Sequence, residues 1–156
     1  MARRESSRIA HGSTASRRRC VSLHGSAARA VRTASSEPAS TTSTTRIVLS
    51  GTDANNAAVI NVYDGSYNLL GTLPNTTRAV ALYQDATPHV FAYTYDSASS
   101  QALRYDLTAS QSGGAYSSIA SAPAANPGAS VRMAISPDGG TLFIAGSSQI
   151  VVQPAP

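Results

Sequence analysis

The sequence predicts an all-β fold of short antiparallel strands, and three observations lead to this prediction. From residue 46 onward, short apolar runs rich in Val, Ile, Leu, Tyr and Thr follow one another about every ten residues, a spacing typical of all-β modules. Turn-forming stretches such as PDGG and NPG separate the runs. No helical period lies between them, so neighbouring strands are expected to pair antiparallel.

The first expected group of strands contains RIVLS at 46–50, AAVINVY at 57–63 and NLLGTL at 68–73. The stretches GTDANN and DGS separate these runs, and both are rich in the residues that favour tight turns. Val, Ile and Leu recur within each run, as expected for strands with a buried face. We therefore expect three strands of one sheet between residues 46 and 73.

The second expected group begins after PNTT and has four members: 78–83, 89–95, 101–106 and 115–120. HVFAYTY, at 89–95, is a short apolar and aromatic run of the kind that strands use. The loop segments QDATP, DSASS and TASQSGG separate the four runs, and the glycines at 113 and 114 are expected to serve a turn. This group predicts a complete four-stranded sheet over residues 78–120.

The third expected group follows APAANPGAS and consists of strands at 131–136, 141–146 and 149–153. Ser-Pro-Asp-Gly-Gly joins the first two of these strands, and its proline suits the second position of a turn. The second glycine pair, at 139 and 140, supplies a positive φ for the return of the chain. Residues 131–153 are thus expected to form a partial sheet of three strands.

The last two groups contain matching segments. Arg78 begins a strand that leads to Asp85 and then to an apolar run, and Arg132 begins a similar series that passes through Asp138. Tyr-Asp pairs also close strands at 63–64 and 105–106, and a period of about 40 to 50 residues is usual for a four-stranded propeller blade. The sequence therefore predicts blade repeats, with 46–73 and 131–153 as partial blades and 78–120 as a complete one.

The segment AISPDGGTLFIAGSSQIVVQ, residues 134–153, resembles the repeat of YVTN-type and lactonase-like β-propellers. In that repeat one strand ends in Ser-Pro-Asp-Gly, a Leu-Tyr/Phe-Val strand follows, and a third strand continues the blade. Residues 83–86, Tyr-Gln-Asp-Ala, keep only the aspartate of the motif. The resemblance extends over about 46–153 and implies a fold, because the same repeat occurs in enzymes, binding proteins and surface proteins.

A propeller ring normally needs four to eight blades, whereas about one complete and two partial blades are expected here. The predicted fold is therefore an incomplete ring, and we expect the chain to be a fragment of a larger protein. A small β-sandwich is the competing fold, since the same strands could form two packed sheets. An isolated propeller fragment is expected to self-associate through exposed strand edges.

Residues 1–45 differ in composition from the remainder and are expected to form a disordered Arg/Ser/Ala-rich tail. They hold eight Arg and two Glu, for a net charge of +6, whereas residues 46–156 hold four Arg and six Asp, for −2; the two parts add to the overall +4. The tail lacks the apolar core of a secretory signal, and no run is long enough for a transmembrane helix. Because no aromatic residue is interleaved with the arginines, no specific nucleic-acid partner is predicted.

Few residues are candidates for catalysis or metal binding, and no catalytic, metal-binding or cofactor-binding residue is predicted. His89, together with Asp85 and a nearby hydroxyl, supplies the residue types of a catalytic triad, but its place at the start of an apolar strand favours a structural role. Six aspartates stand one at a time near strand ends, and capping of turns accounts for them: Asp53, Asp64, Asp85, Asp96, Asp106 and Asp138.

The seven tyrosines suit half-buried sheets, although they could also suggest a sugar-binding surface. Asn75-Thr76-Thr77 matches the short acceptor pattern for N-glycosylation.

These observations favour a non-catalytic propeller-repeat segment that presents loops for binding, within a larger secreted or cell-surface bacterial protein. The parent protein is expected to be extracellular or periplasmic, and its ligand, a protein or a carbohydrate, is unknown. The alternative is a piece of a lactonase-like hydrolase whose catalytic residues lie in other blades. No cofactor is predicted for this chain.

Overall fold

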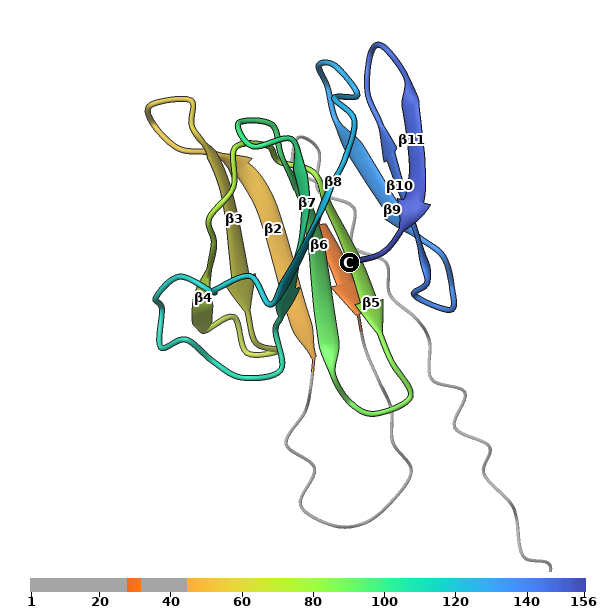
Figure 1. The fold of residues 1–156 in the computed structure, drawn as a ribbon. Helices are drawn as coiled ribbons and strands as arrows, with labels where there is room; N and C mark the ends of the chain where they lie inside the picture. Colours follow the sequence, from red (N-terminus) through yellow and green to blue (C-terminus); the bar gives the residue numbers. More distant parts are fainter. Residues whose placement is uncertain (1–27, 32–44) are drawn as a thin grey trace, which may run out of the picture.

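The computed structural model describes residues 28–31 and 45–156, which form three antiparallel sheets lying side by side (Figure 1). The strands are β1 (Ala28–Val31), β2 (Arg46–Thr52), β3 (Ala58–Tyr63), β4 (Leu69–Leu73), β5 (Val80–Gln84), β6 (Val90–Asp96), β7 (Gln101–Asp106), β8 (Ala120–Pro123), β9 (Arg132–Ile135), β10 (Thr141–Ala145) and β11 (Ile150–Pro154). The all-β prediction is confirmed. Within the described ranges the sheets do not close into a ring.

The first sheet has the strand order β1-β2-β3-β4, with one more strand than the sequence predicts. The additional strand, β1, pairs with β2 in the register Ala28↔Leu49 and lies within the segment that we expected to be disordered. Residues 28–31 are thus described as a strand inside this segment. The rest of the predicted tail, 1–27 and 32–44, lies outside the described residues and stays a prediction.

The second sheet has the order β5-β6-β7-β8, and its fourth strand differs from the prediction. The expected strand at 115–120 is replaced by β8 at 120–123, which pairs with β7 in the register Gln101↔Pro123. Ala115 instead forms an isolated parallel bridge with Thr72 of the first sheet. The β7–β8 connection therefore covers the outer edge of β4, where the backbone groups of an edge strand would otherwise lack partners.

The third sheet has the order β9-β10-β11. Its first turn closes as the sequence predicts: Gly139 has a φ of +73°, and its N–H donates to the carbonyl of Ser136 at 2.9 Å. A side chain at this glycine would meet the ring of Tyr83 in the neighbouring sheet, because a Cβ built there lies 2.5 Å from the ring. Glycine is needed here both for the positive φ and for the close approach of two sheets.

The core consists of two apolar layers that share the middle sheet. One layer contains buried residues such as Val48, Ile60 and Tyr105 and lies between the first two sheets. The other contains Tyr93, Leu142 and their neighbours and lies between the second and third sheets. Because β6 carries side chains into both layers, six of its seven residues are buried.

The first strands of the three sheets lie next to one another. β5 contacts β1 on one side and β9 on the other, and the colours of Figure 1 place the short orange β1 beside β5. The described loops next to β5 and β9 are therefore close to one another. In the described part of the chain, no helix has the length and apolarity needed to cross a membrane.

Candidate ligand-binding pocket

Loops from all three sheets surround a pocket of about 340 Å³. Its lining comes from the β2–β3 hairpin, the β4–β5 connection, the β6–β7 turn and the β8–β9 loop together with the start of β9. The lining residues are Thr52, Asn56, Ala58, Thr76, Thr77, Arg78, Ser97, Gly128, Ala129, Ser130, Val131 and Arg132. This volume lies at the small end of the range for ligand pockets, which suits a small molecule or one unit of a larger ligand.

Hydrogen bonds fix the β8–β9 wall of the pocket to the β10–β11 turn. The backbone N–H of Ala129 donates to Oγ of Ser147 at 2.9 Å, and the N–H of Ser147 donates to the carbonyl of Ala129 at 2.9 Å. The N–H of Ser148 also donates to the carbonyl of Pro127 at 3.0 Å. Gly146 permits this contact, because a Cβ there would lie 2.3 Å from the same carbonyl oxygen. The wall is thus held in place before any ligand arrives.

A second wall is organised by the hydroxyl of Thr76. This hydroxyl donates to Oδ1 of Asp96 at 2.5 Å and accepts the backbone N–H of Ser97 at 2.8 Å, so it joins the β4–β5 connection to the β6–β7 turn. Beside it, Oγ1 of Thr77 donates to the carbonyl of Tyr95 at 2.6 Å. The two threonines therefore set the position of Arg78, the next residue of the chain.

Two lining residues have left-handed backbone conformations that are uncommon outside glycine. Asn56 has a φ of +61° and Ser130 a φ of +57°. Asparagine tolerates this region because its short side chain can bond locally, whereas serine adopts it at a higher cost. Three further residues with a positive φ, Tyr67, Ser100 and Ser112, lie outside the lining, so this backbone conformation is a property of the turns and is not specific to the pocket.

The pocket carries two exposed cationic side chains, Arg78 and Arg132. The single ion pair among the described residues joins Asp85 to His89, so no described carboxylate pairs with either of these arginines. Within residues 28–31 and 45–156, the side chain of Arg132 makes one local bond, from Nη1 to the carbonyl of Val131 at 3.2 Å. Both guanidinium groups are consequently available to a ligand.

The predicted turn role of the six aspartates is confirmed, because Oδ1 of each accepts at least one backbone N–H from its own turn. Hydrogen bonds also lower the pKa of three of these carboxyls below the usual value. The main donors are the side chain of Asn68 for Asp64, the hydroxyl of Ser99 for Asp96 and the hydroxyl of Ser136 for Asp138. Hydrogen bonding to the charged form accounts for the direction of each shift.

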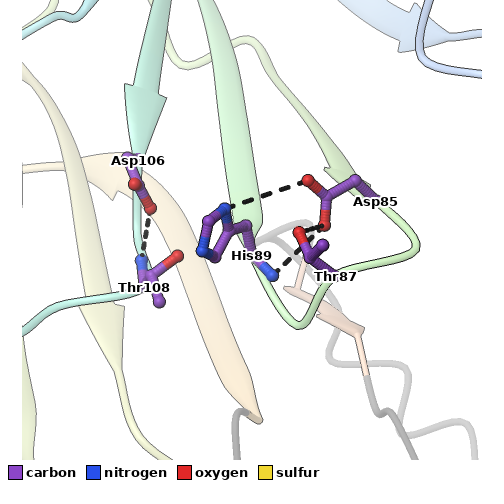
Figure 2. A network of polar contacts seen from close by, with 5 residues as sticks. All are labelled: Asp85, Thr87, His89, Asp106 and Thr108. Carbon is purple, nitrogen blue, oxygen red and sulfur yellow. Dashed lines mark hydrogen bonds and ion pairs between the residues drawn. The ribbon is translucent and has the colours of Figure 1, made fainter.

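His89 and Asp85 lie together in the β5–β6 turn, apart from the residues that line the pocket (Figure 2). Nδ1 of His89 is 3.9 Å from Oδ2 of Asp85, which is longer than a hydrogen bond, and half of the imidazole side chain is exposed. Oδ1 of Asp85 accepts the hydroxyl of Thr87 at 2.7 Å and the backbone N–H of His89 at 3.3 Å. These bonds order the turn, and the imidazole of His89 packs edge-on against the ring of Phe91.

Two of the large buried tyrosines bond to backbone carbonyls, whereas the buried hydroxyl of Tyr95 has no hydrogen-bond partner among the described residues. The hydroxyl of Tyr105 donates to the carbonyl of Pro74 at 3.0 Å, and that of Tyr116 donates to the carbonyl of Ala109 at 2.9 Å. Burial raises the pKa of both phenols above the usual value. No tyrosine lines the pocket.

At the predicted glycosylation motif, Nδ2 of Asn75, the atom that would carry the glycan, donates to the carbonyl of Thr77 at 2.7 Å.

Sequence reasoning did not find the pocket, although one signal for it was present. Arg78 and Arg132 occupy matching positions in the two repeat segments, and the structure brings them to one pocket. The surrounding lining residues with hydroxyl and amide side chains follow no recognisable spacing in the sequence. Within the described residues, no group of three or more His, Cys, Asp or Glu is placed to hold a metal ion.

Comparison of the chain with protein-family models, curated proteins and solved structures found no match. The resemblance of residues 134–153 to propeller repeats therefore rests on that motif alone.

Proposed function

We propose that this chain is a non-catalytic binding scaffold built from β-propeller-type blades, as part of a larger secreted or cell-surface protein. One observation carries the proposal: three consecutive sheets stack face to face, and loops from all three converge on one preformed polar pocket. Positioning of loops by a rigid stack of sheets is the usual way in which such folds bind ligands.

The strand order supports the blade assignment. In each sheet the strands follow one another in chain order, as they do in a propeller blade. The first strands, β1, β5 and β9, are neighbours, which corresponds to the innermost strands around a propeller axis. A β-sandwich has two packed sheets, whereas the three sheets here share a central one that is covered on both faces.

The pocket supports the binding role. It lies where the loops next to β5 and β9 meet the β2–β3 hairpin, so a ligand would contact residues that are far apart in the sequence. Its walls are fixed by hydrogen bonds to neighbouring turns, and preformed walls reduce the entropy cost of binding.

The binding role can be tested by NMR on the ¹⁵N-labelled chain, titrated with a panel of sugars, sugar acids and short peptides. We expect saturable shifts confined to the amides of residues 52–58, 76–78, 97 and 128–132. Shifts confined to other surfaces would contradict a role for this pocket.

The non-catalytic role is tested separately by incubating the same chain with a panel of lactones, with and without divalent metal ions. We expect hydrolysis at the rate of buffer alone. Turnover that depends on the chain would overturn the proposal in favour of the lactonase-like alternative.

The propeller assignment is tested by determining the complete transcript of the gene. We expect further in-frame repeats of about 40 to 50 residues with short strands and turn motifs, because a ring needs four or more blades. A complete transcript that encodes these 156 residues alone would contradict it.

A further inference from the structure

Arg78 and Arg132 line the same pocket and occupy equivalent positions in two neighbouring sheets. Each stands at or just before the first strand of its sheet, Arg78 two residues before β5 and Arg132 at the first residue of β9. Because β5 and β9 are neighbours, repetition of the fold brings both arginines into the lining of one pocket. A guanidinium group presents a planar fork of N–H donors that matches an oxyanion with two oxygens.

The remaining lining combines hydrogen-bonding groups with a smaller share of aliphatic surface from Ala58, Ala129 and Val131. Hydroxyls come from Thr52, Ser97 and Ser130, and an amide comes from Asn56. Among the described residues that line the pocket, none is aromatic. A stacking platform for nucleobases or for the apolar face of a neutral sugar is therefore missing from this lining, and the strongest interactions that it offers are ionic.

Two carboxylates are near lining residues in the sequence: Asp53 bonds within its own turn, and Asp96 bonds both within its turn and to the lining residue Thr76 of the β4–β5 connection. Oδ1 of Asp53 accepts the backbone N–H groups of Asn55 and Ala57, at 2.8 and 2.9 Å. Asp96 accepts the hydroxyls of Thr76 and Ser99. Neither carboxylate belongs to the lining or forms an ion pair with a described arginine. The lining itself therefore has an excess of positive charge.

We propose that this pocket binds the oxyanion group of a small ligand, a carboxylate, sulfate or phosphate, between Arg78 and Arg132. The neighbouring hydroxyls and the Asn56 amide suit a ligand whose oxyanion is flanked by hydroxyl groups, as in an acidic sugar. This inference rests on the proposed function, because it names the class of ligand that the pocket takes.

The experiment measures binding of glucuronate, inorganic sulfate, inorganic phosphate and neutral glucose to the whole chain by NMR titration at low ionic strength. We expect at least one anion to bind saturably at the lining residues and glucose to bind at least tenfold more weakly. Comparison of the three anions tells whether a sugar carboxylate, a sulfate or a phosphate is preferred. Binding should weaken as NaCl is added, because salt screens exposed charges.

The decisive variants are Arg78→Gln and Arg132→Gln. Each should weaken anion binding by about tenfold or more, the loss expected when one charge-assisted hydrogen-bonding group is removed. Arg18→Gln is the matched control, because it removes the same charge from the Arg-rich N-terminal segment. Thermal unfolding of each variant shows whether the fold is intact, and we expect it to be, since both pocket arginines are exposed.

Three outcomes would overturn the inference: no saturable anion binding, equal binding of glucose and glucuronate, or losses in the pocket variants no larger than the loss in Arg18→Gln. Failure of the inference differs from failure of the proposed function. If only neutral ligands shift the lining amides, the pocket binds but not through an oxyanion. Lactone turnover would instead contradict the non-catalytic role.

Discussion

Arg46 joins the first two sheets through its buried side chain. Nε donates to the carbonyl of Leu107 at 2.6 Å, and Nη2 donates to the carbonyl of Thr108. Both acceptors belong to the β7–β8 connection, more than 60 residues further along the chain. One side chain therefore satisfies two carbonyl groups that the fold brings beside the start of β2.

Replacement of Arg46 by methionine should lower the free energy of unfolding by about 2 to 4 kcal/mol, because the two carbonyls lose their donors inside the protein. Arg46→Lys should be intermediate, since a single ammonium group lacks the planar fork. Urea unfolding followed by circular dichroism measures the change. The exposed Arg132→Met is the control and should differ from the parent by no more than about 0.5 kcal/mol. Equal stability of Arg46→Met and the parent would contradict this role.

The carboxyls of Asp64, Asp96 and Asp138 predict how stability depends on acidity. Their pKa values are lower in the folded chain than in the unfolded chain, so their contribution is complete above the unfolded value and is lost as pH falls through the folded value. The urea midpoint should therefore fall on acidification below about pH 4. Asp138→Asn should show a smaller fall than the parent. An identical acid profile for the two proteins would exclude a contribution from this carboxyl.

Gly71 of β4 leaves the space that the β7–β8 connection occupies. The N–H of Thr72 donates to the carbonyl of Gly114 at 2.9 Å, and the N–H of Tyr116 donates to the carbonyl of Thr72 at 2.8 Å. A Cβ at Gly71 would lie 2.6 Å from that Gly114 carbonyl and 2.7 Å from the ring of Tyr116.

Gly71→Ala should therefore destabilise the protein by about 1 to 3 kcal/mol, the usual cost of overpacking. It should also speed proteolysis of the β7–β8 connection, which limited proteolysis with mass spectrometry would locate. Gly51→Ala is the matched control, because it lies in a strand of the same sheet and no atom is within 4 Å of the added Cβ. If both variants unfolded at the same urea concentration, the absence of a side chain at Gly71 would not contribute to the free energy of unfolding.

The sequence predicts most elements because strand periodicity and turn chemistry are local. The expected 101–106 coincides with β7, and most other strands differ by one or two residues at their ends. β1 was missed because its four residues lie in an Arg-rich segment and depend on pairing with β2. The strand expected at 115–120 was displaced because residues 115 and 116 pair with β4 instead. The pocket was missed because its residues meet only through the packing of three sheets.

The third sheet has an apolar face that no other described sheet covers. Phe143 and Val152 are paired across β10 and β11 and are 39% and 58% exposed, and Ile150 beside them is 69% exposed. The outer edge of β11 has no partner strand among the described residues. In the middle sheet, by contrast, both faces are covered by neighbouring sheets.

We therefore expect the chain to self-associate in a concentration-dependent way, because an apolar face and an open strand edge favour pairing with another copy. Size-exclusion chromatography with multi-angle light scattering measures the mass. Val152→Lys should shift the distribution toward the monomer, whereas Ala98→Lys, in an exposed turn, should not. A monomer at all concentrations, for the parent and both variants alike, would contradict this expectation.

The attachment of the β8–β9 wall to the β10–β11 turn has a thermodynamic consequence. If the third sheet detaches by local unfolding, residues 128–130 lose the turn that holds them, so this open form lacks one wall of the pocket. A ligand that binds only the closed form disfavours detachment in proportion to its occupancy. Amides of β10 and β11, which do not line the pocket, should therefore exchange their hydrogens more slowly when the pocket is filled. The stability of the contact between the third sheet and the second would then depend on the concentration of a small molecule.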